Sequence, residues 1–459
     1  MRATGLGSAE SAMRAVRIGV GAGYAGDRIA PALDLVERAS LDYIVFECLA
    51  ERTIALAQQA RTNNPDLGYD PMLPARMRRV LPACRRAGTR LISNMGAANP
   101  IAAARRTRDI AQELGLAGLR IAAIEGDDVL ALFESGELAR AELIETGQPV
   151  STLRGRIVPA NAYIGCEPVV EALRQHADVV LGGRIADPSL FLGAMIHHFD
   201  WRTDDWPKLG AGIMIGHLLE CAGQLTGGYF ADPPFKEVPD LAHLGFPYAE
   251  VGPDGSAEFS KLLHTGGALT LQTAKEQLLY EIHDPRRYLT PDVAADFSSV
   301  HLRQSGVDRV SASGASGSQR PDSLKVSIGY SDGFIGEGQI TYAGTGAADR
   351  ARLAIAVVRQ QLEELGGEIT ELRMEMIGVN SVNPANQSAN SSEVRVRIAG
   401  RTESMEQAEL IGAAVEALYT NGPAAGGGVT RSARPVIAIA SALIPRDLVR
   451  TRIHFEVTS

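Results

Sequence analysis

The sequence predicts an α/β protein, with a doubly wound, mostly parallel sheet in its N-terminal half and a smaller C-terminal α+β domain. Three observations indicate this class. Short β-branched runs alternate with stretches of helical spacing over residues 16–199, these runs are apolar along their whole length, and the texture changes after Trp201. Strands that are covered on both faces and joined by helices form parallel sheets with right-handed crossovers.

Six apolar runs are the predicted parallel strands, and each is followed by at least one helical stretch. The strands are Val16–Val20, Tyr43–Cys48, Arg90–Asn94, Leu119–Ile124, Ile157–Asn161 and Val179–Gly183. The helices are Ile29–Ala39, Ala50–Thr62, Met77–Ala87, Pro100–Leu114, Asp128–Glu134, Pro168–His176 and Pro188–Phe199. Six strand–helix units fit a doubly wound open sheet better than a closed eightfold barrel.

The chain of 459 residues is too long for one hydrophobic core, so several domains are expected. We expect a frayed N-terminus at 1–15, an α/β domain with a strand-end site at 16–225, a loop-rich connecting region at 226–316 and an α+β domain at 317–459. The middle region is rich in glycine, proline and aspartate, whereas β-α-β texture returns in the last one.

Composition restricts the partners and the compartment. Hydrophobic residues make up 45% and charged residues 22%, as in packed globular proteins. The net charge of −9 leaves no basic face for nucleic acid. Four scattered cysteines indicate reduced thiols, and neither a signal peptide nor a membrane-spanning apolar run is present. We expect a cytoplasmic protein that acts on a small molecule, and a homo-oligomer from the general frequency of symmetric assemblies.

A glycine-rich motif, Gly21-Ala-Gly23-Tyr-Ala-Gly26, follows the first predicted strand. Such a turn exposes backbone N–H groups at a helix N-terminus, where an anion binds. Glu47, at the end of the second strand, stands where a dinucleotide site contacts a ribose. The motif predicts an anion site, with NAD or FAD as one possibility. A plain sharp turn is the alternative, since Asp27 caps the helix and would repel a pyrophosphate.

Polar residues follow the other predicted strands, at the edge where open α/β sheets bind ligands. They are Asn94, Asp127, Asn161 and the segment Gly183-Arg184-Ile-Ala-Asp187. Arg184 suits a bidentate clamp on a carboxylate or phosphate, and a structural ion pair with Asp187 is the alternative. Asp127 is a candidate general base, and the amides near Gly183 are candidate oxyanion donors.

His217, Glu220 and Gln224 fall at i, i+3 and i+7, so they share one face of a predicted helix. A histidine with a glutamate three residues on can form a general-base pair, which makes His217 and Glu220 candidate catalytic residues. A satisfied polar cluster at a domain interface is the alternative. No second histidine lies near, which argues against zinc, and no metal ligand is assigned.

Lys261 is followed shortly by a turn at Thr265-Gly266-Gly267. A lysine before a glycine turn can hold an anionic tail, so Lys261 and Gly266 are the last candidates for substrate binding. The chain has no GxSxG elbow, P-loop, HExxH or kinase signature. Hydrolysis through a serine triad and ATP-driven chemistry are therefore unsupported.

Several long motifs, in this order, resemble the acyclic terpene utilisation protein family, AtuA. They include GVGAGYAGDRIAPALDLVE, SNMGAANP, ANAYIGCEPVVEAL, GGRIADPSLFLG, IGHLLECAGQLTGGYFAD and EQLLYEIHDPRRYLTPDV. The resemblance covers nearly the whole chain. It implies a place beside the acyl-CoA carboxylases, enoyl-CoA hydratases and dehydrogenases that degrade branched acyclic terpenoids, and it supplies no catalytic residues to carry over.

Three functions follow from these observations. The first is a lyase or hydro-lyase on a small acyl-CoA or hydroxy-carboxylate, with His217 or Asp127 as the base. The second is an oxidoreductase that uses NAD(P) or FAD at the glycine motif. The third is a non-catalytic subunit or scaffold that binds an acyl-CoA carboxylase. No cofactor is assigned: a coenzyme A thioester enters as a substrate, and NAD belongs to the second function.

Overall fold

The computed structural model describes residues 15–366, 368–383 and 391–459. The expected frayed segment at 1–15 lies outside the described residues except for Ala15. The described chain divides into two compact units. Unit 1 holds the residues up to Arg154, Val158–Ile328 and Ala440–Ser459, and unit 2 holds Gly155–Ile157 and Gly329–Ile439. The last residues of the predicted 317–459 domain therefore belong to unit 1.

Unit 1 is built on one ten-stranded sheet with the order β11-β12-β8-β7-β1-β2-β3-β6-β4-β18. Five neighbouring strands are parallel: β1 (Val16–Ala22), β2 (Tyr43–Phe46), β3 (Arg90–Ser93), β6 (Val179–Gly182) and β4 (Arg120–Glu125). The flanking strands are antiparallel: β7 (Pro247–Val251), β8 (Ala257–Lys261), β12 (Arg309–Ser313), β11 (His301–Gly306) and β18 (Arg452–Val457). The α/β class is thus confirmed, and the large sheet is mixed.

One predicted strand lies outside this sheet. β5 (Ile157–Ala162) was expected as a fifth parallel strand, but it pairs with β14 (Ser323–Ala343) instead. No position between β3 and β4 is open to β5, because β6 pairs with both of these strands, through Leu91↔Val179 and Ile121↔Val179. The local apolar pattern predicted the strand correctly and could not predict its partner.

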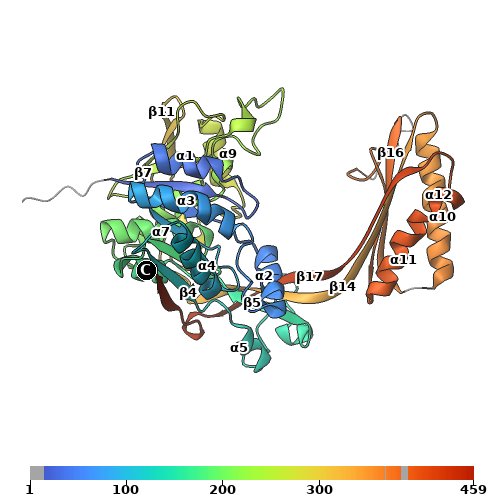
Figure 1. The fold of residues 1–459 in the computed structure, drawn as a ribbon, viewed down its shortest axis with the longest axis horizontal. Coiled ribbons are helices and arrows are strands. Elements are labelled where there is room, and N and C mark those ends of the chain that lie inside the picture. Colours follow the sequence, from blue (N-terminus) through green and yellow to red (C-terminus); the bar gives the residue numbers. More distant parts are fainter. Residues whose placement is uncertain (1–14, 367, 384–390) are drawn as a thin grey trace, which may run out of the picture. The chain divides into compact units, whose positions relative to one another are not determined.

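Two sets of helices cover the parallel strands. In Figure 1, α1 (Ala30–Arg38), α3 (Leu73–Ala87) and α4 (Pro100–Glu113) lie side by side. The second set, packed in series, is α6 (Glu167–Arg174), α7 (Asp187–Phe199) and α8 (Trp206–Glu220). All residues of β2 and β6 are buried, as strands covered on both faces require. Asn99 caps α4 by accepting from the Ala102 amide, with Pro100 in the first turn.

The remaining elements of unit 1 surround the strand ends. They are α2 (Glu51–Asn63), α5 (Leu130–Glu134), α9 (Leu271–Leu279), the short turns Val150–Leu153, Ala222–Gln224, Leu241–His243 and Arg446–Leu448, and a small sheet of β9 (Tyr288–Leu289), β10 (Ala294–Asp296) and β13 (Ser316–Ser318). Residues 226–316 thus contribute strands to both sheets of this unit.

Unit 2 is an antiparallel sheet with helices on one face. Its strands follow the order β15 (Ile369–Ile377), β16 (Glu393–Thr402), β14 and β17 (Gly427–Pro445), and its helices are α10 (Ala347–Leu365), α11 (Met405–Glu416) and α12 (Leu418–Asn421). Val394, Val396 and Ile398 of β16 are buried with α10 and α11, as the two-residue period of a strand requires.

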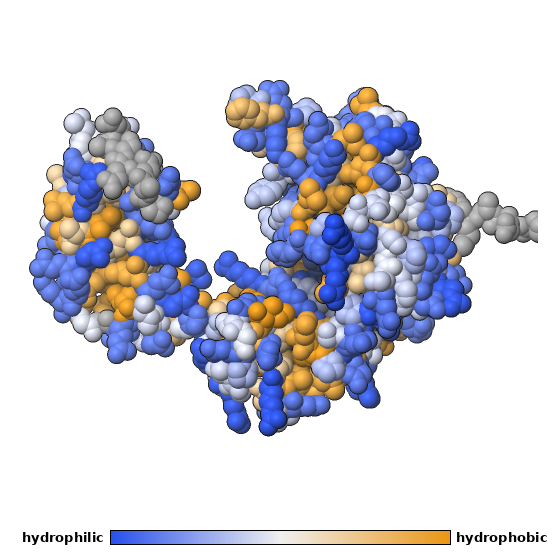
Figure 2. Space-filling model, turned by 180° about the vertical axis from the view of Figure 1, so that it is seen from behind, coloured by the Kyte–Doolittle hydropathy of each residue, from blue (hydrophilic) through white to orange (hydrophobic). Residues whose placement is uncertain are grey.

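Most hydrophobic residues lie in two separate cores, one in each unit. On the face shown in Figure 2, hydrophobic patches also reach the surface of both units, between hydrophilic residues. Among the helices that the structure describes, none combines the length and the apolar character needed to cross a membrane.

Candidate functional site

Unit 1 contains a cavity of about 1140 Å³ at the carboxyl ends of β1, β2 and β6. Three strand-end loops form one wall of it: residues 23–28, 47–51 and 184–188. The end of α8 and residues 280–291 also line the cavity. This is the edge at which open α/β sheets bind ligands. Of the sequence-predicted candidates, Gly23, Glu47, Arg184, Asp187 and Glu220 line the cavity.

Arg184 is the buried cation of the first wall, with 2% of its surface exposed. Its Nη1 donates to the Leu49 carbonyl and to Asp187 Oδ1 at 2.9 Å, and its Nη2 donates to the Tyr163 hydroxyl at 2.7 Å. Burial opposes the charge, but the anionic neighbours dominate and raise the pKa of Arg184 above its usual range. The predicted ion pair with Asp187 is therefore present, and Arg184 stays charged.

Two residues without a local sequence signal complete this wall. Glu51, the first residue of α2, accepts a hydrogen bond from the Tyr163 hydroxyl, and Lys325 of β14 lies 3.5 Å from its carboxylate. Burial would raise the pKa of Glu51, but Tyr163, Arg184 and Lys325 lower it to about 2. The group is thus a fixed anion between cations. Contacts between residues this far apart in the sequence leave no pattern that sequence reasoning can use.

One donor of Arg184 has no partner. Its Nε is buried and unpaired, although a guanidinium carries five N–H groups that all require acceptors. The Tyr163 ring lies under the guanidinium, 4.0 Å from Cζ to the ring centroid, and fixes its plane. The cation at this wall therefore has a fixed orientation and one buried donor that the described residues do not satisfy.

Glu220, at the end of α8, is another titratable group that lines the cavity. Its Oε1 lies 3.0 Å from His217 Nδ1, whereas its Oε2 is buried without a partner. Burial raises the pKa of Glu220 to about 7, against the opposing effect of His217, and Asp187 and Glu281 add to the rise. A carboxyl group with this pKa can give or take a proton near neutral pH.

His217 lies behind Glu220 and does not line the cavity. It is 1% exposed, and its ring contacts those of Tyr288 and Phe297 at centroid distances of 5.6 and 5.9 Å. Burial lowers its pKa, but the hydrogen bond and the charge of Glu220 outweigh this and raise it. His217 is therefore placed to orient Glu220, and Glu220 is the member of the pair that a ligand can reach.

Glu47 and Asp187 add two further carboxyl groups to the cavity. Glu47 Oε1 accepts from the Leu49 amide at 2.9 Å and from Asn94 Nδ2 at 3.0 Å. Burial and the nearby Asp187 raise the pKa of Glu47 well above its usual range, and burial also raises the pKa of Asp187. Asn94 itself does not line the cavity. It holds Glu47 and the Cys48 amide in place.

Asp127, Asn161 and Gly183 lie together in a layer beneath Arg184. Asp127 Oδ2 accepts from Asn161 Nδ2 and from the Arg184 backbone amide, both at 2.9 Å. A Cβ on Gly183 would lie 2.4 Å from Asp127 Oδ1, so glycine is required for this close approach. Burial raises the pKa of Asp127 to about 6. None of the three lines the cavity, and they tie the ends of three strands under the Arg184 loop.

The glycine motif is a tight turn whose amide is already occupied. The Gly23 and Arg28 amides donate to the Asp27 carboxylate at 2.9 and 3.1 Å. A Cβ on Gly21 or Gly23 would lie 2.4 or 2.5 Å from the Phe46 ring or the Cys221 backbone, and a Cβ on Gly26 would lie 2.4 Å from the Tyr24 hydroxyl. α1 begins only at Ala30. Close packing explains these glycines, and the Asp27 carboxylate holds the amide that a pyrophosphate would need.

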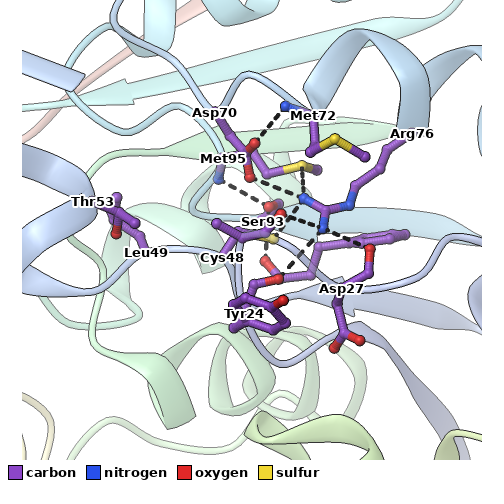
Figure 3. Close-up of polar contacts among 12 residues, drawn as sticks. Tyr24, Asp27, Cys48, Leu49, Thr53, Asp70, Met72, Arg76, Ser93 and Met95 are labelled. Atoms are coloured by element: carbon purple, nitrogen blue, oxygen red, sulfur yellow. Dashed lines mark hydrogen bonds and ion pairs between the residues drawn. The ribbon is translucent and has the colours of Figure 1, made fainter. Parts of the chain in front are cut away.

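Arg76 of α3 also holds this turn, and no local sequence signal indicates that role. Its guanidinium, 1% exposed, donates to the Ala25 carbonyl at 2.8 Å, the Asp27 carbonyl at 3.3 Å, Asp70 Oδ2 at 2.9 Å and Cys48 Sγ at 3.2 Å. Figure 3 shows the guanidinium at the centre of these contacts. Arg76 thus fixes the loop that bears the cavity residues 23–28.

Lys261 and Gly266 lie away from the cavity. Lys261 Nζ donates to the Thr265 carbonyl at 2.9 Å and forms an ion pair with Asp308 at 3.2 Å. A Cβ on Gly266 would lie 1.8 Å from the Asp240 carbonyl oxygen. Both residues join loops to one another. Among the residues that the structure describes, no three His, Cys, Asp or Glu side chains gather as metal ligands.

Comparison with known proteins gives one match. The family model described as acyclic terpene utilisation family protein AtuA matches residues 16–455. No curated protein matches the chain, and no solved structure does.

Proposed function

The chain belongs to the acyclic terpene utilisation family AtuA, and we propose that it is an enzyme of branched or terpenoid acyl breakdown, a lyase or hydro-lyase on a small acyl-CoA or hydroxy-carboxylate. One observation carries the proposal. Glu220, a carboxyl group with a pKa of about 7, and the buried cation Arg184 line the same cavity. A proton-transfer group and a fixed cation within one cavity are what elimination beside a carbonyl requires.

In the proposed reaction, the substrate carbonyl or carboxylate oxygen binds beside the Arg184 guanidinium, which lines the cavity. Glu220, in its ionised form, takes the proton from the carbon beside the carbonyl, and the Arg184 charge stabilises the enolate that forms. The hydroxyl group leaves as water after it receives a proton. Glu47, whose pKa burial and the nearby Asp187 raise well above its usual range, donates it. The reverse sequence adds water.

His217 acts through Glu220 in this scheme. It holds Oε1, so that the unpartnered Oε2 faces the reacting carbon. Since the base form of Glu220 is required, the rate of elimination should fall as the pH drops below about 7.

The test is turnover of a panel of branched hydroxyacyl-CoA, enoyl-CoA and hydroxy-carboxylate compounds, with loss or gain of water followed by mass spectrometry. Glu220→Gln should lower kcat by a factor on the order of 10²–10⁴. Glu250→Gln is the matched control, because this glutamate forms an ion pair with Arg17 at the surface, outside the cavity. No turnover and no thermal shift with any member of the panel would refute the proposal.

A further inference from the structure

A second, smaller groove of about 270 Å³ adjoins the main cavity. Both are lined by Gln224, Gly228, Tyr229 and Tyr280. The groove adds Phe230, Glu276, Gln277 and Leu279 to these shared residues, and Leu279 leaves 63% of its surface exposed. A ligand in the main cavity can therefore extend into the groove past Tyr229.

Tyr229 stands at this junction in a conformation that is unusual for an aromatic residue. Its φ is 61°, in the left-handed region, and 87% of its surface is exposed. A bulky residue with such a φ is strained, and strain of this kind concentrates at functional sites. No burial of the ring compensates for the strain.

Hydrogen bonds and close packing fix the turn that carries Tyr229. The Gly228 amide donates to the Gly223 carbonyl at 2.8 Å, and Thr226 Oγ1 donates to the Gly245 carbonyl at 2.7 Å. A Cβ on Gly227, whose φ is 103°, would lie 2.7 Å from Val238. The ring is thus held at the boundary of cavity and groove by a tightly packed turn.

Apolar side chains near this turn also line the main cavity. Leu241, Leu244 and Phe246 line the cavity together with Tyr229, whereas Arg184, Glu51 and Lys325 line its charged wall. A ligand that satisfies both regions has a polar head and a hydrocarbon tail.

We propose that the groove between Tyr229 and Leu279 binds the hydrocarbon tail of the substrate and that it sets the preferred chain length. Only the placement of the head at Arg184 rests on the function proposed above. Each methylene that enters such a groove tightens binding by about threefold to fourfold, from the transfer free energy of a CH₂ group. Binding should therefore strengthen with chain length until the groove is full.

The experiment measures displacement of a neutral fluorescent probe, N-phenyl-1-naphthylamine, from the full-length protein. The competitors are butanol, octanol and dodecanol, and the matching straight-chain carboxylates. For the wild type we expect both series to bind more tightly as the chain lengthens. Tyr229→Ala and Leu279→Ala should each reduce the gain from butyl to dodecyl by about tenfold, which corresponds to roughly two buried methylenes.

Phe235→Ala is the matched control. Phe235 lies in the same loop region and is 86% exposed, but it lines neither the cavity nor the groove. Its substitution should leave the chain-length dependence unchanged.

The outcomes separate this inference from the proposed function. If the probe does not bind, if chain length has no effect, or if Tyr229→Ala and Leu279→Ala behave as Phe235→Ala does, the tail groove is refuted. If alcohols show the dependence and carboxylates bind no more tightly than alcohols of equal length, the groove stands and the anionic head site fails. If carboxylates bind equally at every length, the head site stands and the groove fails.

Discussion

Replacing Arg76 by methionine should destabilise unit 1 by about 3–5 kcal/mol, the cost of leaving one member of a buried ion pair alone. Asp70 is 5% exposed and would lose the guanidinium that lies 2.9 Å from its Oδ2. Protonation of Asp70 limits this loss of stability. Adding a proton at pH 7 to a carboxyl group with an ordinary pKa of 3.8 costs about 4 kcal/mol. The carbonyls of the 24–27 turn lose their donor as well.

The assay is urea unfolding of the full-length protein followed by tryptophan fluorescence. Both tryptophans, Trp201 and Trp206, belong to unit 1, so the signal reports the unit that contains Arg76. Arg86→Met is the matched control, since Arg86 lies in the same helix but pairs with Glu37 at the surface, where the two side chains are 66% and 44% exposed. This control should lose less than about 1 kcal/mol.

A second variant tests the cause of the loss. Arg76→Met combined with Asp70→Asn removes both charges and should recover a large part of the stability, because no uncompensated buried charge remains. The single variant should also regain stability as the pH falls, since the buried Asp70 then binds a proton. If Arg76→Met costs no more than Arg86→Met, or if the double variant is no more stable than the single one, the ion pair does not hold the turn in the way described.

Three further predictions follow from the charges of unit 1. The pKa of Glu220 in the folded protein is about 7 and exceeds its ordinary value of 4.5, so the folded protein binds this proton more tightly than the unfolded chain does. The resulting stabilisation is full below pH 4.5 and is lost as the pH rises through 7. This pH dependence of the urea unfolding midpoint should be absent in Glu220→Gln. Lys261→Met leaves Asp308 without its cation and should cost about 1–3 kcal/mol in urea unfolding, without changing ligand affinity. Because Asp27 holds the Gly23 amide, calorimetry should detect no NAD binding at millimolar concentration, and a dissociation constant below that range would contradict this reading of the loop.

The order of local elements could be predicted from the sequence, whereas the composition of the sheet could not. Apolar runs such as Tyr43–Phe46 and Val179–Gly182 are strands because both of their faces are buried. The antiparallel flanks depend on pairing between distant segments. β18 joins β4 through Ile453↔Ile124, more than 300 residues apart, and only long-range packing selects that partner.

The position of the candidate site followed from the rule for strand ends, but its membership depends on three-dimensional packing. Arg184 and Asp187 could be predicted as site residues because they follow a strand directly. Glu51 and Lys325 come from α2 and β14, and Arg76 reaches the loops through the core from α3. A charged residue on a helix has the same local signature whether it faces solvent or a cavity, so sequence alone does not separate the two.

The strand-end residues divide into two layers with different roles. Residues nearest the sheet, such as Asp127, Asn161 and Gly183, contact one another and join neighbouring strands. Residues one or a few positions further along, such as Arg184 and Asp187, are held above them and reach the cavity. Substitutions in the lower layer should therefore change stability and ligand affinity together, whereas Glu220→Gln at the cavity wall should change turnover at nearly constant affinity. Measuring both quantities for each variant would separate residues that support the site from those that act in it.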